Sequence, residues 1–189
     1  MTTINLVKEI AKRIESDVSR YNFQESDGVH VLRTPCVWEQ HLPEKLFDQK
    51  VDPSDYPFVQ VFCSGSRIVR DNDRVVRYGD VVILVAGYDD GIEIGDTGVR
   101  DQQGWLIPSE IIDMIVSSLL TKPVVGGKHE VQVETITTEL PEDQPIPLWY
   151  GTMSASFTIP VPPQGFGMED WVMNQTIPPN VRNVEEIYT

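Results

Sequence analysis

One stretch near the carboxyl end restricts the fold more than any other, because apolar and polar side chains alternate along it. Between residues 152 and 161, a Thr, Ser or Pro separates each pair of successive apolar residues, which are Met153, Ala155, Phe157, Ile159 and Val161. Successive side chains of a β-strand point to opposite faces of its sheet. The pattern therefore predicts a strand with one face in a hydrophobic core and the other face more polar.

Shorter patterns predict the remaining strands of this sheet. Gly79-Asp80 separates two β-prone runs and predicts a tight turn there. The second of these runs (VVILVAG) is apolar throughout, so we expect a strand covered on both faces. Gly126-Gly127 predicts another turn, ahead of a second alternating stretch. The strands predicted in this way are 29–38, 58–62, 75–78, 81–87 and 131–135.

Two stretches have helical periodicity. In residues 4–20 the apolar side chains recur every three or four positions, as Ile4, Val7, Ala11, Ile14 and Val18. A second helix is predicted from about Pro108 to Thr121, with a buried face of Ile111, Ile112, Ile115, Val116, Leu119 and Leu120. The fold class is then α+β, a mostly antiparallel sheet with both helices on one face and the order α-β-β-β-β-α-β-β.

The length of 189 residues suits one domain with an appendage. We assign residues 1–163 to the α+β domain and residues 164–189 to an extended C-terminal arm. This arm is rich in proline and has no clear period, but it carries Trp171 and Met173. Apolar side chains on an arm need a partner surface, on their own domain or on a neighbouring subunit.

The net charge is −14 and the pI is about 4.5, which disfavours tight binding to a phosphate backbone. Solubility alone also accounts for such a charge. Cys36 and Cys63 are expected to be free thiols in a reducing cytoplasm. The charged, amphipathic start of the chain and the lack of an apolar run of about 18 residues predict a soluble protein made inside a cell.

Motifs for catalysis or metal binding are weak in this chain. The acids between residues 89 and 104 do not follow the register of a calcium loop, so we expect a solvated acidic loop. Gly127-Lys128 lacks the preceding Gly and the following Ser or Thr of a phosphate loop. His30, His41 and His129 lack metal-ligand spacing, although one of them paired with a Cys nucleophile stays open. We therefore expect no catalytic residue, no cofactor and no metal.

The order of motifs resembles the tail terminator (tail completion) proteins of long-tailed bacteriophages. The resemblance covers about residues 4–162, from the first helix through Tyr56-Pro57-Phe58 and Tyr88-Asp89-Asp90 to the final strand. In that family an acidic turn with two prolines and an aromatic-Gly pair precedes the final strand. The matching residues are Glu142, Asp143, Gln144, Pro145, Pro147, Trp149, Tyr150 and Gly151.

This resemblance implies a structural, non-enzymatic protein of the virion tail or neck, made in the bacterial cytoplasm. Such proteins form a homo-oligomeric ring, typically a hexamer, which caps the tail tube, ends its elongation and meets the head–tail connector. DNA passes through the ring without specific binding, and an acidic lining suits that passage. We expect the arm residues Trp171 and Met173 at a subunit interface, and an acidic group facing the lumen or the tube: Asp89, Asp90, Glu93 and Asp96.

Two alternatives stay open at this point. One is another neck or head-completion connector protein, which differs from a terminator in ring stoichiometry and position. The other is a small cytoplasmic α+β hydrolase or ligand-binding domain, which requires a deep pocket with convergent polar groups.

Overall fold

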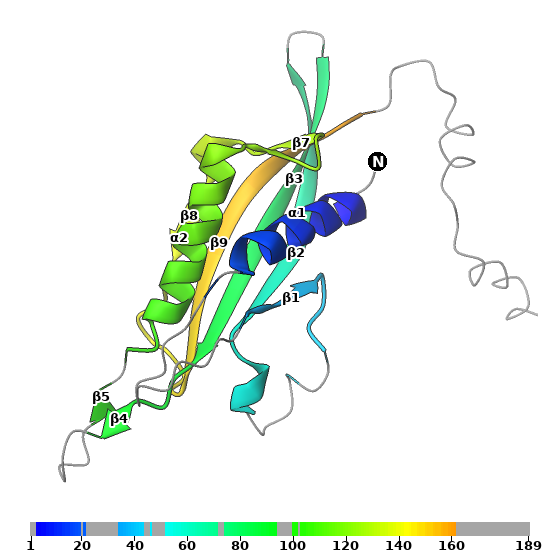
Figure 1. The fold of residues 1–189 in the computed structure, drawn as a ribbon. Coiled ribbons are helices and arrows are strands. Elements are labelled where there is room, and N and C mark those ends of the chain that lie inside the picture. The colour runs from blue at the N-terminus through cyan, green and yellow to red at the C-terminus, as the bar shows by residue number, and fades with distance from the viewer. Residues whose placement is uncertain are drawn as a thin grey trace, which may run out of the picture.

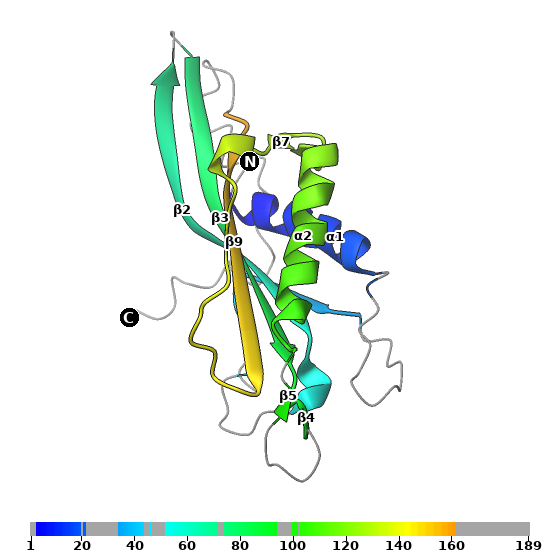
Figure 2. The same ribbon diagram turned by 90° about the vertical axis from the view of Figure 1, so that its left-hand side faces the viewer.

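The structure, a computed structural model, describes residues 3–19, 21, 34–43, 46, 52–71, 74–93, 100–101 and 103–161. Two helices, α1 (Thr3–Val18) and α2 (Leu106–Thr121), lie against one sheet (Figures 1 and 2). The described residues also include the short 3-10 helices η2 (Pro53–Asp55) and η4 (Val133–Thr135). The strands are β1 (Cys36–Glu39), β2 (Phe58–Asp71), β3 (Arg74–Tyr88), β4 (Ile92–Glu93), β5 (Arg100–Asp101), β6 (Val124–Val125), β7 (His129–Glu130), β8 (Thr137–Glu139) and β9 (Leu148–Ile159).

The main sheet has five strands in the order β1-β2-β3-β9-β8. Only β1 runs parallel to its neighbour β2, and every other pair in this sheet is antiparallel. The pairs β4–β5 and β6–β7 form small sheets of their own. Both helices cover the same face of the main sheet (Figure 2), so the predicted α+β class is confirmed.

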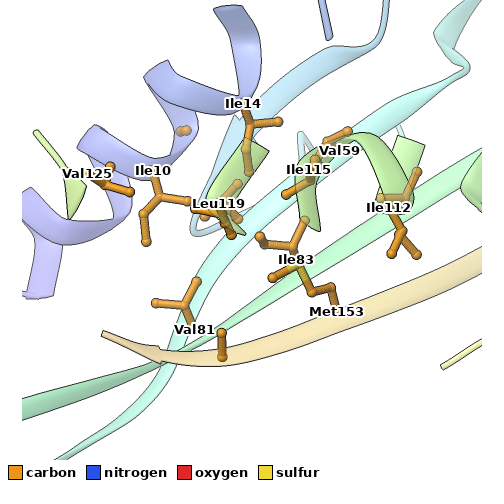
Figure 3. Close-up of a cluster of buried hydrophobic side chains, with 14 of the residues drawn as sticks. Ile10, Ile14, Val59, Val81, Ile83, Ile112, Ile115, Leu119, Val125 and Met153 are labelled. Carbon is orange, nitrogen blue, oxygen red and sulfur yellow. The ribbon is translucent and has the colours of Figure 1, made fainter. Parts of the chain in front are cut away.

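The core lies between this sheet face and the two helices (Figure 3). Ile10 and Ile14 of α1 lie beside Ile115 of α2, and Ile83 and Met153 lie on the sheet side of the core. Each of these side chains is almost fully buried. Burying one such side chain stabilises the fold by about 1.5–3 kcal/mol. The predicted alternation is confirmed for Met153, Ala155, Phe157 and Ile159, which all lie in this core. It is wrong for Val161, which lies beyond the end of β9 and is exposed.

Among the described residues, a second hydrophobic cluster covers part of the opposite face of the sheet. Tyr56, Phe58 and Ala86 are buried there, in contact with partly buried side chains that include Trp38 and Tyr150. Farther along the same face, Val82 and Leu84 are only half-buried. The apolar run 81–87 is therefore buried on the helix side and less completely covered on the other side, where Val82 and Leu84 are half-buried.

Gly79 and Asp80 form no turn, because β3 continues through them without interruption. A Cβ atom at Gly79 would lie 2.7 Å from Leu6 Cδ2 and 3.0 Å from Ile159 Cδ1. This glycine therefore makes room for α1 on the sheet. The glycines at 126 and 127 do turn the chain, with φ values of 58° and 66° that suit a β-hairpin.

Two further strand predictions are corrected by the structure. The described part of the first predicted strand is β1, which begins only at Cys36, after Pro35. Residues 131–135 form no strand: Val131 makes a single bridge to Phe157, and η4 follows, with Thr135 Oγ1 donating to the Gln132 carbonyl oxygen at 2.7 Å.

The helix predictions were right in position and wrong at two residues. Leu120 is exposed, because a rotation of about 100° per residue carries it away from the face of α2 that contains Ile111 and Ile115. Ile4 is exposed because it lies at the margin of the buried stripe of α1, which is centred on Ile10 and Ile14.

Candidate assembly surface

The two longest strands of the sheet, β2 and β3, form a hairpin. Its ladder runs from Phe58 opposite Ala86 to Asp71 opposite Arg74. On its far side, β3 pairs with β9 only as far as Arg77. The end of the hairpin extends beyond both helices (Figures 1 and 2).

No described strand pairs with the outer side of β2 along most of its length. Within the described residues, β1 pairs with β2 only from Phe58 to Val61. Gln40, with φ 63°, ends this pairing: its N–H donates to the Val61 carbonyl oxygen at 2.8 Å, and its Oε1 accepts the Cys63 N–H at 3.4 Å. We call the outer side of β2 from residue 64 to residue 71 the hairpin edge.

Exposed apolar and basic side chains stand together on the hairpin edge. Ile68 is 69% exposed, and its neighbours Val69 and Arg70 are exposed as well. In water, adjacent apolar side chains on an open strand favour contact with another surface. Residues 64–80 carry four arginines and three aspartates, in a chain with 29 acidic residues and 15 basic ones.

One arginine of the hairpin braces the sheet. Arg67 Nη1 donates to Asp80 Oδ1 at 2.6 Å and Nη2 donates to Ser156 Oγ at 3.2 Å, and the guanidinium lies 5.2 Å from the ring centroid of Tyr78. Ser156 Oγ in turn donates to Asp80 Oδ1 at 2.6 Å. This network ties the base of the hairpin to β9.

The opposite margin of the sheet is β8, and we call its outer side the β8 edge. All three of its residues are exposed, and no described strand pairs with this side. Exposed apolar side chains flank it, namely Val133, Leu140 and Ile146. Residues 129–161 contain no Lys or Arg, and their acids are Glu130, Glu134, Glu139, Glu142 and Asp143. This margin is therefore acidic as well as partly apolar.

Of the predicted acidic group, Asp89 has a clear local role. Its Oδ1 accepts the Gly91 N–H at 2.9 Å, and its Oδ2 accepts the Gln103 N–H at 3.1 Å. The Asp89 carbonyl oxygen also accepts the indole N–H of Trp149 at 3.2 Å. Asp89 thus closes the base of the loop that leaves β3.

The structure describes only some of the other predicted site residues. Asp90 is exposed beside Asp89. The backbone of Glu93 pairs with Arg100 in the small β4–β5 sheet. Asp96, Trp171 and Met173 lie outside the described residues, so their placement at a lumen or a subunit interface stays a prediction.

The turn that carries the family resemblance has a physical role in the fold. Gln144 Nε2 donates to the Pro141 carbonyl oxygen at 2.7 Å and to the Tyr150 carbonyl oxygen at 3.0 Å. Its Oε1 accepts the Tyr150 N–H at 2.8 Å. One glutamine side chain therefore folds the connection between β8 and β9.

Groups suited to nucleophilic chemistry do not converge in the described part of the chain. Cys36 is exposed, and Cys63 Sγ donates to the Gly65 carbonyl oxygen at 3.0 Å. His129 is buried, and its Nδ1 lies 2.9 Å from the Thr158 carbonyl oxygen, which requires a proton on Nδ1. No three His, Cys, Asp or Glu side chains of the described residues are placed to hold a metal ion.

Two shallow grooves lie on the described part of the surface. One groove of about 500 Å³ lies between the helices, where Arg13 donates to Ser118 Oγ at 2.7 Å and to the Ser118 carbonyl oxygen at 3.0 Å. A second, of about 400 Å³, lies on the far sheet face beside Phe62 and Leu84.

The shifted pKa values belong to tyrosines in packed clusters. Burial, with smaller effects of Tyr150 and Asp55, raises the pKa of Tyr56 to about 12, and burial also raises the pKa of Tyr150. Burial and the Glu110 carboxylate, which accepts the Tyr21 hydroxyl at 3.1 Å, raise the pKa of Tyr21. These shifts reflect packing of the aromatic rings.

Comparison with known proteins leaves the geometry as the main guide. No protein-family model matches the chain, and no curated protein has significant sequence similarity to it. Among the described helices, none combines the length and the apolar character needed to cross a membrane.

Proposed function

We propose that this protein is a structural component of a bacteriophage tail that acts as a tail terminator. In this proposal its copies form a ring that caps the tail tube, ends tube elongation and offers a surface to the head–tail connector. The ring stays in the virion, and DNA passes through it without specific binding.

One observation carries this proposal: among the described strands, none pairs with the outer side of β2 beyond Val61 or with the outer side of β8. A small domain with two different open edges is suited to head-to-tail contacts, which close into a ring when the rotation between copies allows it. The net charge of −14 also suits a channel that must not retain DNA.

Native mass spectrometry with negative-stain imaging of the same sample tests the proposal. We expect closed rings, and six copies would favour a terminator over a connector with another stoichiometry. A monomer at every concentration up to the solubility limit would overturn the ring.

The acidic loop offers a second test, of the path taken by DNA. Replacing Asp90, Glu93 and Asp96 by Asn or Gln should slow DNA delivery by assembled particles if these side chains face the channel. Asp89 is left unchanged, because its carboxylate closes the loop. Unchanged delivery and unchanged tube capping would refute the assignment.

The arm is tested by deletion of residues 164–189. If Trp171 and Met173 pack on a neighbouring subunit, the shortened chain forms rings only at higher protein concentration. An unchanged ring would remove the arm from the interface.

A further inference from the structure

We infer that the C-terminal arm of one copy adds as a strand to the hairpin edge of the next copy in the ring. The inference rests on the proposed ring and names the contact that joins its copies. Residues 164–189 lie outside the described residues, so their sequence and the place where the described chain ends indicate this role. Addition of an extended segment to an open sheet edge is a common mode of recognition.

The hairpin edge needs an occupant other than the sheet of the next copy. Through β9 and β3, the three residues of β8 lie level with residues 60–62 of β2, beside the part of β2 that β1 covers. A rotation about an axis roughly parallel to the strands keeps these levels. The hairpin edge lies farther along the strands, so the β8 edge of a neighbouring copy does not reach it.

The arm, in contrast, starts at the level of the hairpin edge. β9 ends at Ile159, which lies opposite Arg77, and Arg77 lies opposite Ile68 of β2. From there, residues 162–170 can span about 30 Å when extended. The same rotation places the hairpin edge of the next copy at this level.

The order of the strands favours the next copy over the arm's own hairpin. β3 lies between β9 and β2, so the arm would have to cross both strands of the hairpin to reach the outer side of its own β2. In a head-to-tail ring, the side of β9 away from β3 is directed toward the β2 side of the next copy. The arm reaches that copy's hairpin edge without crossing a strand.

Strand direction allows an antiparallel ladder. β2 and β9 are both antiparallel to β3, so they run in the same direction. A chain that turns back after β9 therefore runs opposite to β2, and the prolines and glycines between residues 160 and 167 favour such a turn. Backbone groups of residues 64–71 gain partners in this ladder.

The hairpin presents an exposed apolar side chain next to a basic one. Ile68 lies opposite Arg77, which is two residues from Gly79, the residue under α1. Ile68 and, two residues farther, Arg70 are therefore on the helix side of the sheet. Ile68 is 69% exposed there, and Arg70 is exposed as well.

The arm carries the complementary side chains at the same spacing. If Trp171 stands beside Ile68 in the antiparallel ladder, Glu169 lies opposite Arg70 and Met173 lies opposite Ser66. Opposite charges and apolar pairs that face each other across a ladder are both stabilising. This register removes Ile68 and Trp171 from water together.

Cysteine cross-linking tests the contact directly. In a background with Cys36→Ser and Cys63→Ser, one chain carries Ser66→Cys and a second chain carries Met173→Cys. The two chains are mixed in dilute solution, concentrated to the range in which rings form and mildly oxidised. We expect a disulfide-linked dimer in the mixture and none in either chain alone. The matched control replaces Ser66→Cys by Glu142→Cys, an exposed position at the opposite end of β9, and should give no dimer.

Native mass spectrometry of the unmodified protein separates this inference from the proposed function. If rings form and the mixture stays unlinked, the contact between arm and hairpin is wrong while the ring stands. If the mixture links but only dimers or open chains form, the contact is right and the ring falls. If neither rings nor links form, both fall.

A single chain with both Ser66→Cys and Met173→Cys distinguishes the two possible hairpins. In the inferred arrangement its oxidation links several chains covalently. Loss of the free thiols without any increase in mass would place the arm on its own hairpin and would overturn the inference.

Charge exchange gives an independent readout. Arg70→Glu or Glu169→Arg alone should raise the protein concentration needed for ring formation about two- to fivefold, because each places like charges opposite each other. A chain with both substitutions should form rings at the wild-type concentration. Thermal denaturation of each variant checks that its domain still folds. A double variant that is impaired as much as the single variants would overturn the inference.

Discussion

Replacing the buried Gly104 by Ala should destabilise the protein more than the same substitution at an exposed glycine. Gly104 is buried just before α2, where the end of β3, the start of β9 and the helix meet. An added Cβ would overlap the indole of Trp149 and lie 2.7 Å from Asp89 Cβ. The Trp149 ring would have to move, and its hydrogen bond to the Asp89 carbonyl oxygen would be lost or weakened.

The size of the destabilisation follows from two unfavourable contributions and one favourable contribution. Overpacking of a tight site costs about 1–3 kcal/mol, and a weakened buried hydrogen bond costs about 1 kcal/mol more. The lower entropy of the unfolded chain with Ala offsets about 0.4–1 kcal/mol. The net loss in free energy of unfolding is therefore about 1–3.5 kcal/mol, centred slightly above 2 kcal/mol.

Urea denaturation followed by circular dichroism measures this loss. With a slope of about 2–3 kcal/mol per molar urea, the midpoint should fall by about 1 M. The matched control is Gly65→Ala, because no atom lies within 4 Å of an added Cβ at Gly65. If the Gly104→Ala midpoint stays with that of the control, the packing described around Trp149 is wrong.

Three further changes have clear expected results. Leu119→Ala should lower the free energy of unfolding by about 2–5 kcal/mol, whereas Leu120→Ala should change it by no more than about 0.5 kcal/mol, because these side chains are 2% and 52% exposed. Thermal melts of the two variants measure the difference. Arg13→Ala should cost about 1–2 kcal/mol in the same assay through its lost bonds to Ser118, and an unchanged melt would show that this contact between the helices is not stabilising. Burial raises the pKa of Tyr56 from its ordinary 10.0 to about 12. The unfolded chain therefore loses the hydroxyl proton at lower pH than the folded chain, and the free energy of unfolding falls between these two pH values. Tyr56→Phe should flatten that fall in alkaline denaturation, and an identical pH profile would contradict this expectation.

Patterns that depend on local periodicity were predictable from the sequence. Both helices and the alternating strand β9 could be predicted, because each buries one regular stripe of side chains against a common core. The turn at Gly126-Gly127 was also predictable, since positive φ values favour glycine.

The errors arise where tertiary contacts decide. Gly79 has the local signature of a turn, but its missing side chain admits Leu6 of a helix that is distant in sequence. Residues 131–135 alternate like a strand, yet hydrogen bonds from Thr135 favour a 3-10 turn: its hydroxyl donates to Gln132 and accepts the Ser156 N–H at 2.8 Å. Leu6 and Ser156 are too distant in sequence to be recognised in a short window around these residues.

For the candidate surface, the sequence pointed to the acidic loop and the arm and missed the hairpin. The prediction ended the strand at Phe62, although Asn72-Asp73 lies between two runs rich in β-branched residues, which is a hairpin signal. The arginines at intervals through this segment were the further clue, because they stand out only against the acidic remainder of the chain.

The hairpin also has a consequence for the order in which the chain folds. β2 and β3 are adjacent in sequence and can pair within microseconds, whereas β9 leaves the ribosome about 60 residues after β3 ends. During that interval both sides of the young hairpin are open to chance pairing with other chains. Arginines along its strands oppose such aggregation, as charged residues do on other edge strands. We expect the amides of residues 66–78 to gain protection first in pulse-labelled hydrogen exchange, and removal of Arg70 to lower the yield of refolding.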